Sequence, residues 1–207
     1  MSTRQAGWRL VVAIALTSFL ASVIAMSPAP RAPGSQRARR SAQREGEAPV
    51  VVVAQDGSGH HTTVQAALDT IPDDNTTHTI VLVRRGTYRE KLFVTKGHVS
   101  IVGEDRETTR IEFAELRRGW RETHPDDWGA AVVNIGPDVT DFVLANLTVR
   151  NDYGATHGDR DHQFAIRSGG NATRIAILHA NVIADGGDTL SLWNAASGLS
   201  YHSDCYF

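Results

Sequence analysis

The most informative part of the sequence reads Val-Val-Val-Ala-Gln-Asp-Gly-Ser-Gly at 51–59, Thr-Val-Gln-Ala-Ala-Leu-Asp at 63–69 and Arg-Gly-Thr-Tyr-Arg-Glu-Lys at 85–91. Gly-rich turns and Ala-rich half-helices are common when they occur singly. The ordered set of three, followed by Ile-Val-Gly-Glu at 101–104, is far more specific than any one of its members.

The sequence around these phrases predicts one short helix and many short strands. The helix covers Val64–Ile71, begins near Thr62 or Thr63 and is closed by Pro72, and we expect it to cap the open first coil of the domain. No ten-residue helical pattern alternates with the strands, which argues against a Rossmann-type sheet. The runs that we interpret as strands are Ile80–Val83, Lys91–Val94, Val99–Val102, Arg110–Phe113, Ala131–Ile135, Phe142–Val149, Ala165–Arg167, Ile175–Leu178 and Thr189–Trp193.

An internal repeat predicts how these strands are arranged. Three segments, at 144–149, 179–184 and 202–207, each have a small residue, then Asn or Asp, then an apolar residue, at offsets of 35 and 23 residues. A period in the twenties is typical of one turn of a solenoid, which predicts a polar ladder of Asn146, Asn181 and Asp204. The longer first interval indicates a loop inserted into one coil at 153–162, and solenoids often place such insertions on the binding face.

The amino-terminal residues differ from the rest of the chain. Arg4 and Arg9 precede an apolar run, so residues 1–25 are interpreted as a signal peptide, with an uncleaved anchor as the alternative. Residues 26–48 are rich in Pro, Ala and Arg and are expected to be a disordered linker, and residues 49–207 form a single domain. We therefore expect a secreted or periplasmic protein that keeps no stable membrane anchor after cleavage.

Composition limits the possible partners. The 207 residues have a formal net charge of −2 and contain a single cysteine, Cys205. No basic aromatic stripe follows residue 50, which excludes a typical nucleic-acid-binding surface. Cys205 has no recognisable His or Asn partner, so we interpret it as a buried packing residue.

The three opening phrases and two later segments together resemble the pectinesterase family. The later segments are Gln-Phe-Ala-Ile-Arg at 163–167 and Gly-Gly-Asp-Thr-Leu at 186–190, which are similar to the family's Gln-Ala-Val-Ala-Leu and Gln-Asp-Thr-Leu signatures. The resemblance covers about residues 50–207. It implies an all-β fold, a right-handed parallel β-helix of the pectin lyase type, truncated at its carboxyl-terminal end. It also implies a carboxylic ester hydrolase that demethylates pectin or a related methyl-esterified polyuronate without a cofactor.

The resemblance also assigns roles to single residues. Ester hydrolysis needs a group that protonates the leaving methoxide and a neutral donor to the oxyanion, and Asp188 and Gln163 match these two roles. The family often has a second Gln where this chain has Gly187. We assign Gly187 and Trp193 to the substrate-binding surface, because an exposed indole offers a face to a sugar ring. As alternatives, Asp188 would be a turn residue, Gln163 part of an internal amide ladder and Trp193 a packing residue.

Several functional alternatives stay open. The family's nucleophilic Asp stands in a Val-Asp-Phe segment that follows Cys-Tyr-Phe, here 205–207, so the chain as given is expected to be an inactive fragment. One alternative is a β-helix that only binds polysaccharide, which Gly187 favours, and another is a pectate lyase, which would need a calcium site of clustered Asp residues. The loop with His157, Asp159, Asp161 and His162 is expected to be solvated, with no metal site.

Overall fold

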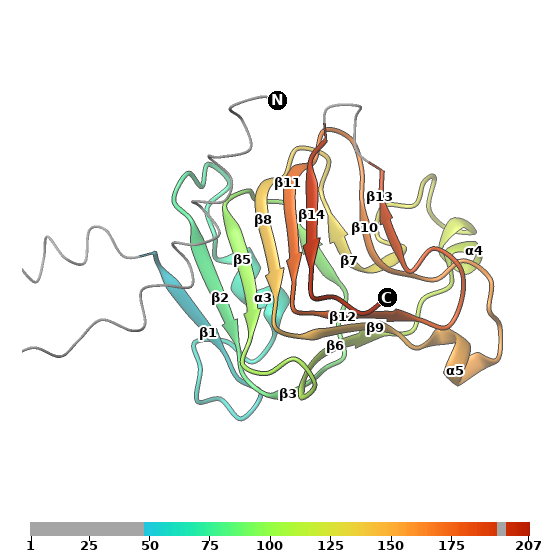
Figure 1. Ribbon diagram of the computed structural model, residues 1–207, viewed down its shortest axis with the longest axis horizontal. Coiled ribbons are helices and arrows are strands. Elements are labelled where there is room, and N and C mark those ends of the chain that lie inside the picture. Colours follow the sequence, from blue (N-terminus) through green and yellow to red (C-terminus); the bar gives the residue numbers. More distant parts are fainter. Residues whose placement is uncertain (1–47, 194–197) are drawn as a thin grey trace, which may run out of the picture. The chain divides into compact units, whose positions relative to one another are not determined.

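The structure is a computed structural model that describes residues 48–193 and 198–207. Within these residues the strands form three sheets in which all pairs are parallel (Figure 1). The first sheet contains β1 (Val50–Val53), β2 (Thr79–Val83), β5 (Val99–Gly103), β8 (Thr140–Ala145), β11 (Thr173–Leu178) and β14 (Ser200–Ser203). The second contains β3 (Gly86–Tyr88), β6 (Thr109–Phe113), β9 (Thr148–Asn151) and β12 (Asn181–Ala184). The third contains β4 (Leu92–Val94), β7 (Ala131–Ile135), β10 (Phe164–Ser168) and β13 (Leu190–Leu192).

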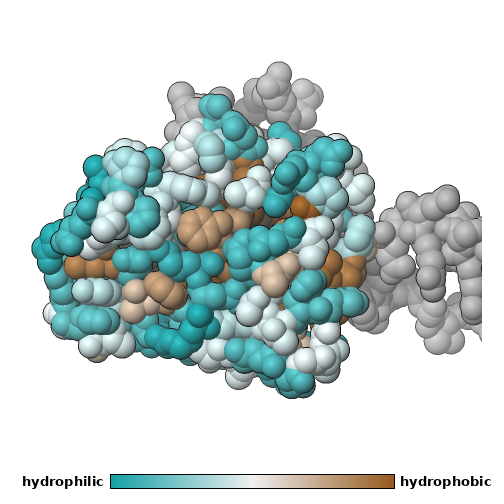
Figure 2. All heavy atoms as spheres, turned by 180° about the vertical axis from the view of Figure 1, so that it is seen from behind, coloured by the Kyte–Doolittle hydropathy of each residue, from teal (hydrophilic) through white to brown (hydrophobic). Residues whose placement is uncertain are grey.

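From β2 onward, each turn of the chain adds one strand to each sheet, so the architecture is a parallel β-helix, and the predicted fold is confirmed. The interior consists of stacked apolar side chains, since register places Ile101, Leu144 and Ile177 at one level of three successive coils. All three are fully buried. Burial of a side chain of this size stabilises the fold by about 1.5–3 kcal/mol. Figure 2 shows the face that is turned away from the viewer in Figure 1. This face is mainly hydrophilic, and its hydrophobic residues are separated by polar ones.

The predicted helix is present as α3 (Val64–Asp69) and packs against β1, β2 and β4. The side chain of Thr63 accepts a hydrogen bond from the backbone N–H of Ala66, so Thr63 is the N-cap. The helix ends two residues earlier than predicted. The hydroxyl of Thr70 donates to the carbonyl of Ala67 at 2.7 Å, which satisfies a carbonyl in the last turn without a further helical residue.

The phrase at 85–91 holds this helix in place. Tyr88 is buried in the core, and the two carboxylate oxygens of Glu90 accept hydrogen bonds from the backbone N–H groups of Val64 and Gln65 at 2.8 and 2.9 Å. These N–H groups belong to the first turn of α3, where no intrahelical partner exists. The sequence segments 63–69 and 85–91 therefore contact each other in the cap of the first coil.

Two expectations about the strands are wrong. The run 142–149 is divided between β8 and β9, because Asn146 adopts a left-handed backbone conformation (φ 56°) that turns the chain into the next sheet. The polar ladder is also misaligned. Register places Asn146 level with His179 and Asp204, which share a positive φ, whereas Asn181 pairs with Thr148. The offsets between the three turn residues are thus 33 and 25 residues, not 35 and 23.

The corner between the second and third sheets carries two long connections. The predicted insertion at 153–162 lies between β9 and β10 and contains α5 (Tyr153–His157). A longer connection at 114–130, which the sequence did not reveal, lies between β6 and β7 and contains α4 (Arg117–Arg121). The corresponding connection of the next coil is residues 185–189. Of the helices that the structure describes, none is long and apolar enough to span a bilayer.

Candidate active site

The three connections meet because the coils that carry them are stacked. The backbone N–H of Arg117 donates to the carbonyl of His162 at 3.0 Å, and the N–H of Gln163 donates to the carbonyl of Gly187 at 3.0 Å. Asn151, which is fully buried, joins the first two connections, because its amide donates to the carbonyl of Glu115 at 2.8 Å and its oxygen accepts from the N–H of Tyr153. The side chains of these segments therefore face one common region.

Asp188 lies at the surface of this region, about half exposed. It has a positive φ of 63°, a conformation that Asp tolerates better than most residues. Its Oδ2 lies 2.5 Å from Nδ1 of His162 in the neighbouring coil. The carboxylate thus has one fixed partner and an open side toward solvent.

Gln163 is fully buried and is level with Gly187, the residue before Asp188. Its Oε1 accepts a hydrogen bond from the N–H of Gly154 at 2.9 Å, and its Nε2 donates to the carbonyl of Asp159 at 2.7 Å. A Cβ on Gly186 would lie only 2.7 Å from this Nε2, so the close approach needs glycine there. The amide of Gln163 therefore ties both ends of the inserted loop to the coil.

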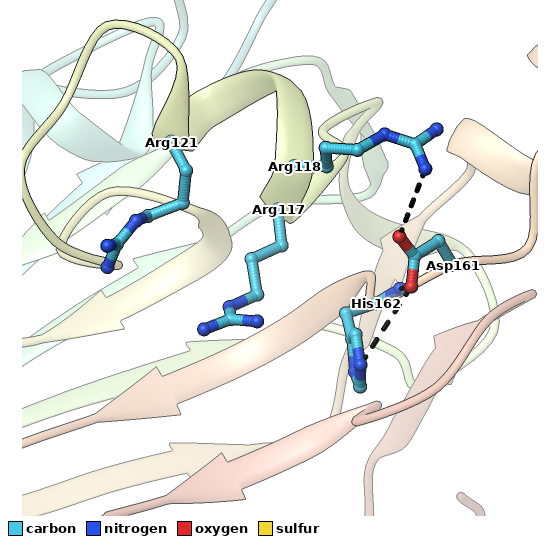
Figure 3. Close-up of a pocket in the computed structure, with 5 residues that line it drawn as sticks. All are labelled: Arg117, Arg118, Arg121, Asp161 and His162. Atoms are coloured by element: carbon cyan, nitrogen blue, oxygen red, sulfur yellow. Dashed lines mark hydrogen bonds and ion pairs between the residues drawn. The ribbon is translucent and has the colours of Figure 1, made fainter.

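A surface hollow with a volume of about 380 Å³ adjoins His162 (Figure 3). Figure 3 shows the side chains of Arg117, Arg118 and Arg121 extending from α4 around it, with Arg118 directed at Asp161. Its lining residues are Arg117, Arg118, Arg121, Asp161 and His162. The hollow is rich in cationic donors, which suits an anionic ligand.

Asp127 forms ion pairs with Arg117, which lines the hollow, and with Arg167. It is buried, and its carboxylate lies 2.9 Å from Nε of Arg117 and 3.1 Å from Nη2 of Arg167. The hydrogen bond to Asp127 raises the pKa of Arg117, whereas burial lowers the pKa of Arg167. Both stay charged at neutral pH because the guanidinium pKa is so high.

Trp193 and Gly187 are both exposed. The indole of Trp193 is 69% exposed, and the guanidinium of Arg167 lies over its ring, 5.4 Å from the ring centre. Gly187 is exposed and its backbone is accessible. Both residues are therefore open to solvent, and Gly187 directly precedes Asp188 in the chain.

The loop residues that invite a metal interpretation have other partners. His157 stacks on Tyr153, and Arg118 pairs with Asp159 at 2.6 Å and Asp161 at 3.4 Å. Across residues 48–193 and 198–207, no three His, Cys, Asp or Glu side chains are grouped in a way that would hold a metal ion. Cys205 is half-buried, and its Sγ donates to the carbonyl of Ile177 at 3.2 Å, away from Asp188.

Sequence reasoning missed the basic lining of this region and the contact of His162 with Asp188. The cluster Arg-Arg-Gly-Trp-Arg at 117–121 carried a usable signal, because three arginines in five residues are unusual on a short segment of a nearly neutral chain. The partner of Asp188 had no such signal, since 26 residues separate it from His162.

Comparison with known proteins points to one family. The family model described as Pectinesterase matches residues 50–197. Pectinesterase 1 of Citrus sinensis is 41% identical over 145 residues, which cover 69% of this chain and 23% of that protein. The probable pectinesterase/pectinesterase inhibitor 23 of Arabidopsis thaliana is 30% identical over 176 residues, which cover 80% of this chain and 28% of that protein.

A solved structure gives the same result. The pectin methylesterase from carrot superposes with a TM-score of 0.59 and 25% identity, over 76% of this chain and 45% of that chain. The chain thus spans about a quarter of the length of the two curated relatives and less than half of the carrot protein.

Proposed function

The chain belongs to the pectinesterase family, and we propose that the protein carrying it hydrolyses the methyl esters of polygalacturonate. The observation that carries the proposal is the position of Asp188. A half-exposed carboxylate with one fixed partner stands where three coil connections meet, beside a hollow lined by arginines. An anionic polymer that lies across this corner would bring its esters to Asp188.

Asp188 is the general acid/base of the proposed reaction. In its protonated form it gives its proton to the departing methoxide, so that methanol leaves, and it then takes a proton from the water that hydrolyses the acyl intermediate. The attacking carboxylate is assigned by the resemblance to a segment that follows Cys205. The proposal therefore concerns the gene product extended to its stop codon.

Gln163 is the proposed oxyanion donor. Its Nε2 carries two hydrogens, of which one donates to the carbonyl of Asp159 and the other is the proposed donor to the tetrahedral intermediate. The bond to Asp159 would fix the orientation of the amide before substrate binds. A donor that needs no reorganisation stabilises a developing charge most effectively.

The arginines of the hollow are proposed to bind uronate carboxylates. Each guanidinium has five N–H donors, and the ion pairs with Asp127, Asp159 and Asp161 use only part of them. Planar guanidinium groups pair well with carboxylates. Trp193 and Gly187 complete the proposed surface, with the indole ring against a sugar face and the bare backbone of Gly187 allowing close approach.

The test is Asp188→Asn in the gene product extended to its stop codon. Asn keeps the size and the left-handed backbone of residue 188 but has no proton to transfer, so methanol release from methylated pectin should fall by a factor of about 10²–10⁴. Asp138→Asn, at another exposed turn, is the matched control. Near-normal turnover by a folded Asp188→Asn protein would contradict the assignment.

The same experiment separates the second candidate function, a β-helix that binds polysaccharide without cleaving it. The observations that favour it are Gly187, which lacks the amide side chain of the family signature, and the buried amide of Gln163. If this candidate is correct, the extended wild-type protein binds methylated pectin in a sedimentation assay and releases no methanol.

We also propose that the protein acts outside the cytoplasm. Support comes from the sequence of residues 1–25, in which Arg4 and Arg9 precede an apolar run of signal-peptide length. These residues and the following linker, apart from Ala48, lie outside the described part of the chain. Amino-terminal sequencing of the protein from its own host should find a start near Met26. Intact Met1 in the cytosolic fraction would contradict export.

A further inference from the structure

Gly187 leaves a space beside Asp188, and the ring of His162 borders it. A Cβ added to Gly187 would lie 3.5 Å from Nδ1 and 3.9 Å from Cε1 of His162, which is ordinary van der Waals contact. The imidazole therefore packs over the position where the family signature has the amide of a second Gln. A nitrogen donor from the neighbouring coil stands close to where the missing amide would begin.

The two ring nitrogens of His162 face two different carboxylates. Its Nδ1 lies 2.5 Å from Oδ2 of Asp188, shorter than the usual 2.7–2.9 Å of a charge-assisted bond, and its Nε2 lies 3.8 Å from Oδ1 of Asp161. The same Oδ1 of Asp161 accepts from the backbone N–H of His162 at 2.8 Å. The carbonyl of His162 accepts from the N–H of Arg117. All three coil connections thus contribute to the position of this ring.

We propose that His162 is a positioning residue for Asp188 and takes over the role that the missing amide would have beside the acid. The inference rests on the proposed function of Asp188. With Nδ1–H donating to Oδ2, the carboxylate is fixed on one side, and Oδ1 faces the substrate. Oδ1 then carries the proton that goes to methoxide and receives the one that water gives up.

The charged groups around the ring come from all three connections. Asp161 and Asp188 face its two nitrogens, and Arg117, Arg118 and Arg121 of α4 lie across the hollow. Gly187 adds no charge. Loss of the ring would leave Asp188 without its hydrogen-bond partner, so that its orientation would change.

The experiment compares His162→Ala with His162→Asn in the gene product extended to its stop codon. The amide of Asn places an N–H close to the position of Nδ1, so it should restore the contact that Ala removes. We expect kcat for methanol release to fall about 10–100-fold in His162→Ala with little change in KM, and His162→Asn to recover most of it. The pH profile of kcat/KM should shift in the Ala variant. His157→Ala, in the same loop and stacked on Tyr153, is the control that should change neither quantity.

A spectroscopic measurement gives a readout without turnover. In protein labelled with ¹⁵N-histidine, His162 should show a strongly downfield Nδ1–H resonance that Asp188→Asn weakens and His162→Asn abolishes. Absence of that resonance from the folded wild type would overturn the proposal.

The two hypotheses fail in different ways. If Asp188→Asn is inactive while His162→Ala keeps wild-type kcat and pH profile, the role of His162 is wrong and that of Asp188 stands. If Asp188→Asn keeps activity, the assignment of Asp188 as the general acid/base is wrong, and the role of His162 with it. Should His162→Ala not fold, equal kcat in His162→Asn and His162→Leu would overturn the positioning role.

Discussion

Asp141 shows how single residues stabilise the turns between coils. It has a left-handed backbone (φ 57°), as do His98 and Arg174 at the same level of the adjacent coils. Arg174 donates to both oxygens of Asp141, at 2.6 and 2.5 Å, and Nδ1 of His98 lies 3.3 Å away. The hydrogen bonds from Arg174 lower the pKa of Asp141 below its ordinary value.

This lowered pKa predicts a pH-dependent contribution to stability. Because the folded pKa lies below the unfolded one, the contribution is complete above the unfolded pKa, about 3.9, and is lost as the pH falls through the folded pKa. Asp141→Asn keeps a residue that tolerates a positive φ. We expect it to lower the urea midpoint at about pH 7 and to change it much less at about pH 2.5.

Asp74→Asn, at an exposed turn, is the control for this measurement. An Asp141→Asn midpoint that falls equally at both pH values would show that the carboxylate charge makes no specific contribution.

The left-handed turn residues also explain why the predicted polar ladder was wrong. Asn, His and Asp all tolerate a left-handed backbone, so Asn146, His179 and Asp204 can stack although they differ in type. Matching by residue type selected Asn181 instead. Asp188 and Gln163, by contrast, were selected by their sequence motifs, and the structure places them in adjacent coils. Their hydrogen-bond partners depend on the packing of coils and could not be predicted.

At the scale of elements, α3 depends on a distant side chain. Glu90 accepts hydrogen bonds from two N–H groups of its first turn, and a carboxylate there also interacts favourably with the helix dipole. Glu90→Ala should lower the free energy of unfolding by about 1–2 kcal/mol, and Glu90→Gln by less. Glu122→Ala, which removes an exposed carboxylate at the end of α4, is the matched control. Equal urea midpoints for Glu90→Ala and wild type would contradict this role.

The strands were predictable from the sequence because they are rich in Val, Ile and Thr, most of which are buried in the interior of the coils, as in β5, β7 and β11. The short strands β3 and β12 were not predicted, since three or four residues give too little pattern. The connection at 114–130 was not predicted either, for a related reason. It has no periodicity of its own and is fixed by contacts with other coils, such as that of Asn151 with Glu115.

At the scale of the whole molecule, repetition determines the fold and departures from it create the site. The order of strands in the first sheet follows the chain coil by coil, so local contacts between neighbours build the entire domain. The fold and the family could therefore be predicted from short segments of the sequence. The candidate site requires three coils to be stacked in the correct register before Asp188, Gln163 and His162 meet.

The connections between the second and third sheets can be used in protein engineering. The connections at 114–130, 152–163 and 185–189 differ in length, yet the strands that flank them stay in register. Foreign peptides grafted between Phe113 and Ala131 would be displayed beside Asp188 on an unchanged scaffold. The corner after Ala145, where a single left-handed residue turns the chain, offers no such freedom. A combinatorial library aimed at new polysaccharide substrates would therefore vary one corner and keep the other constant.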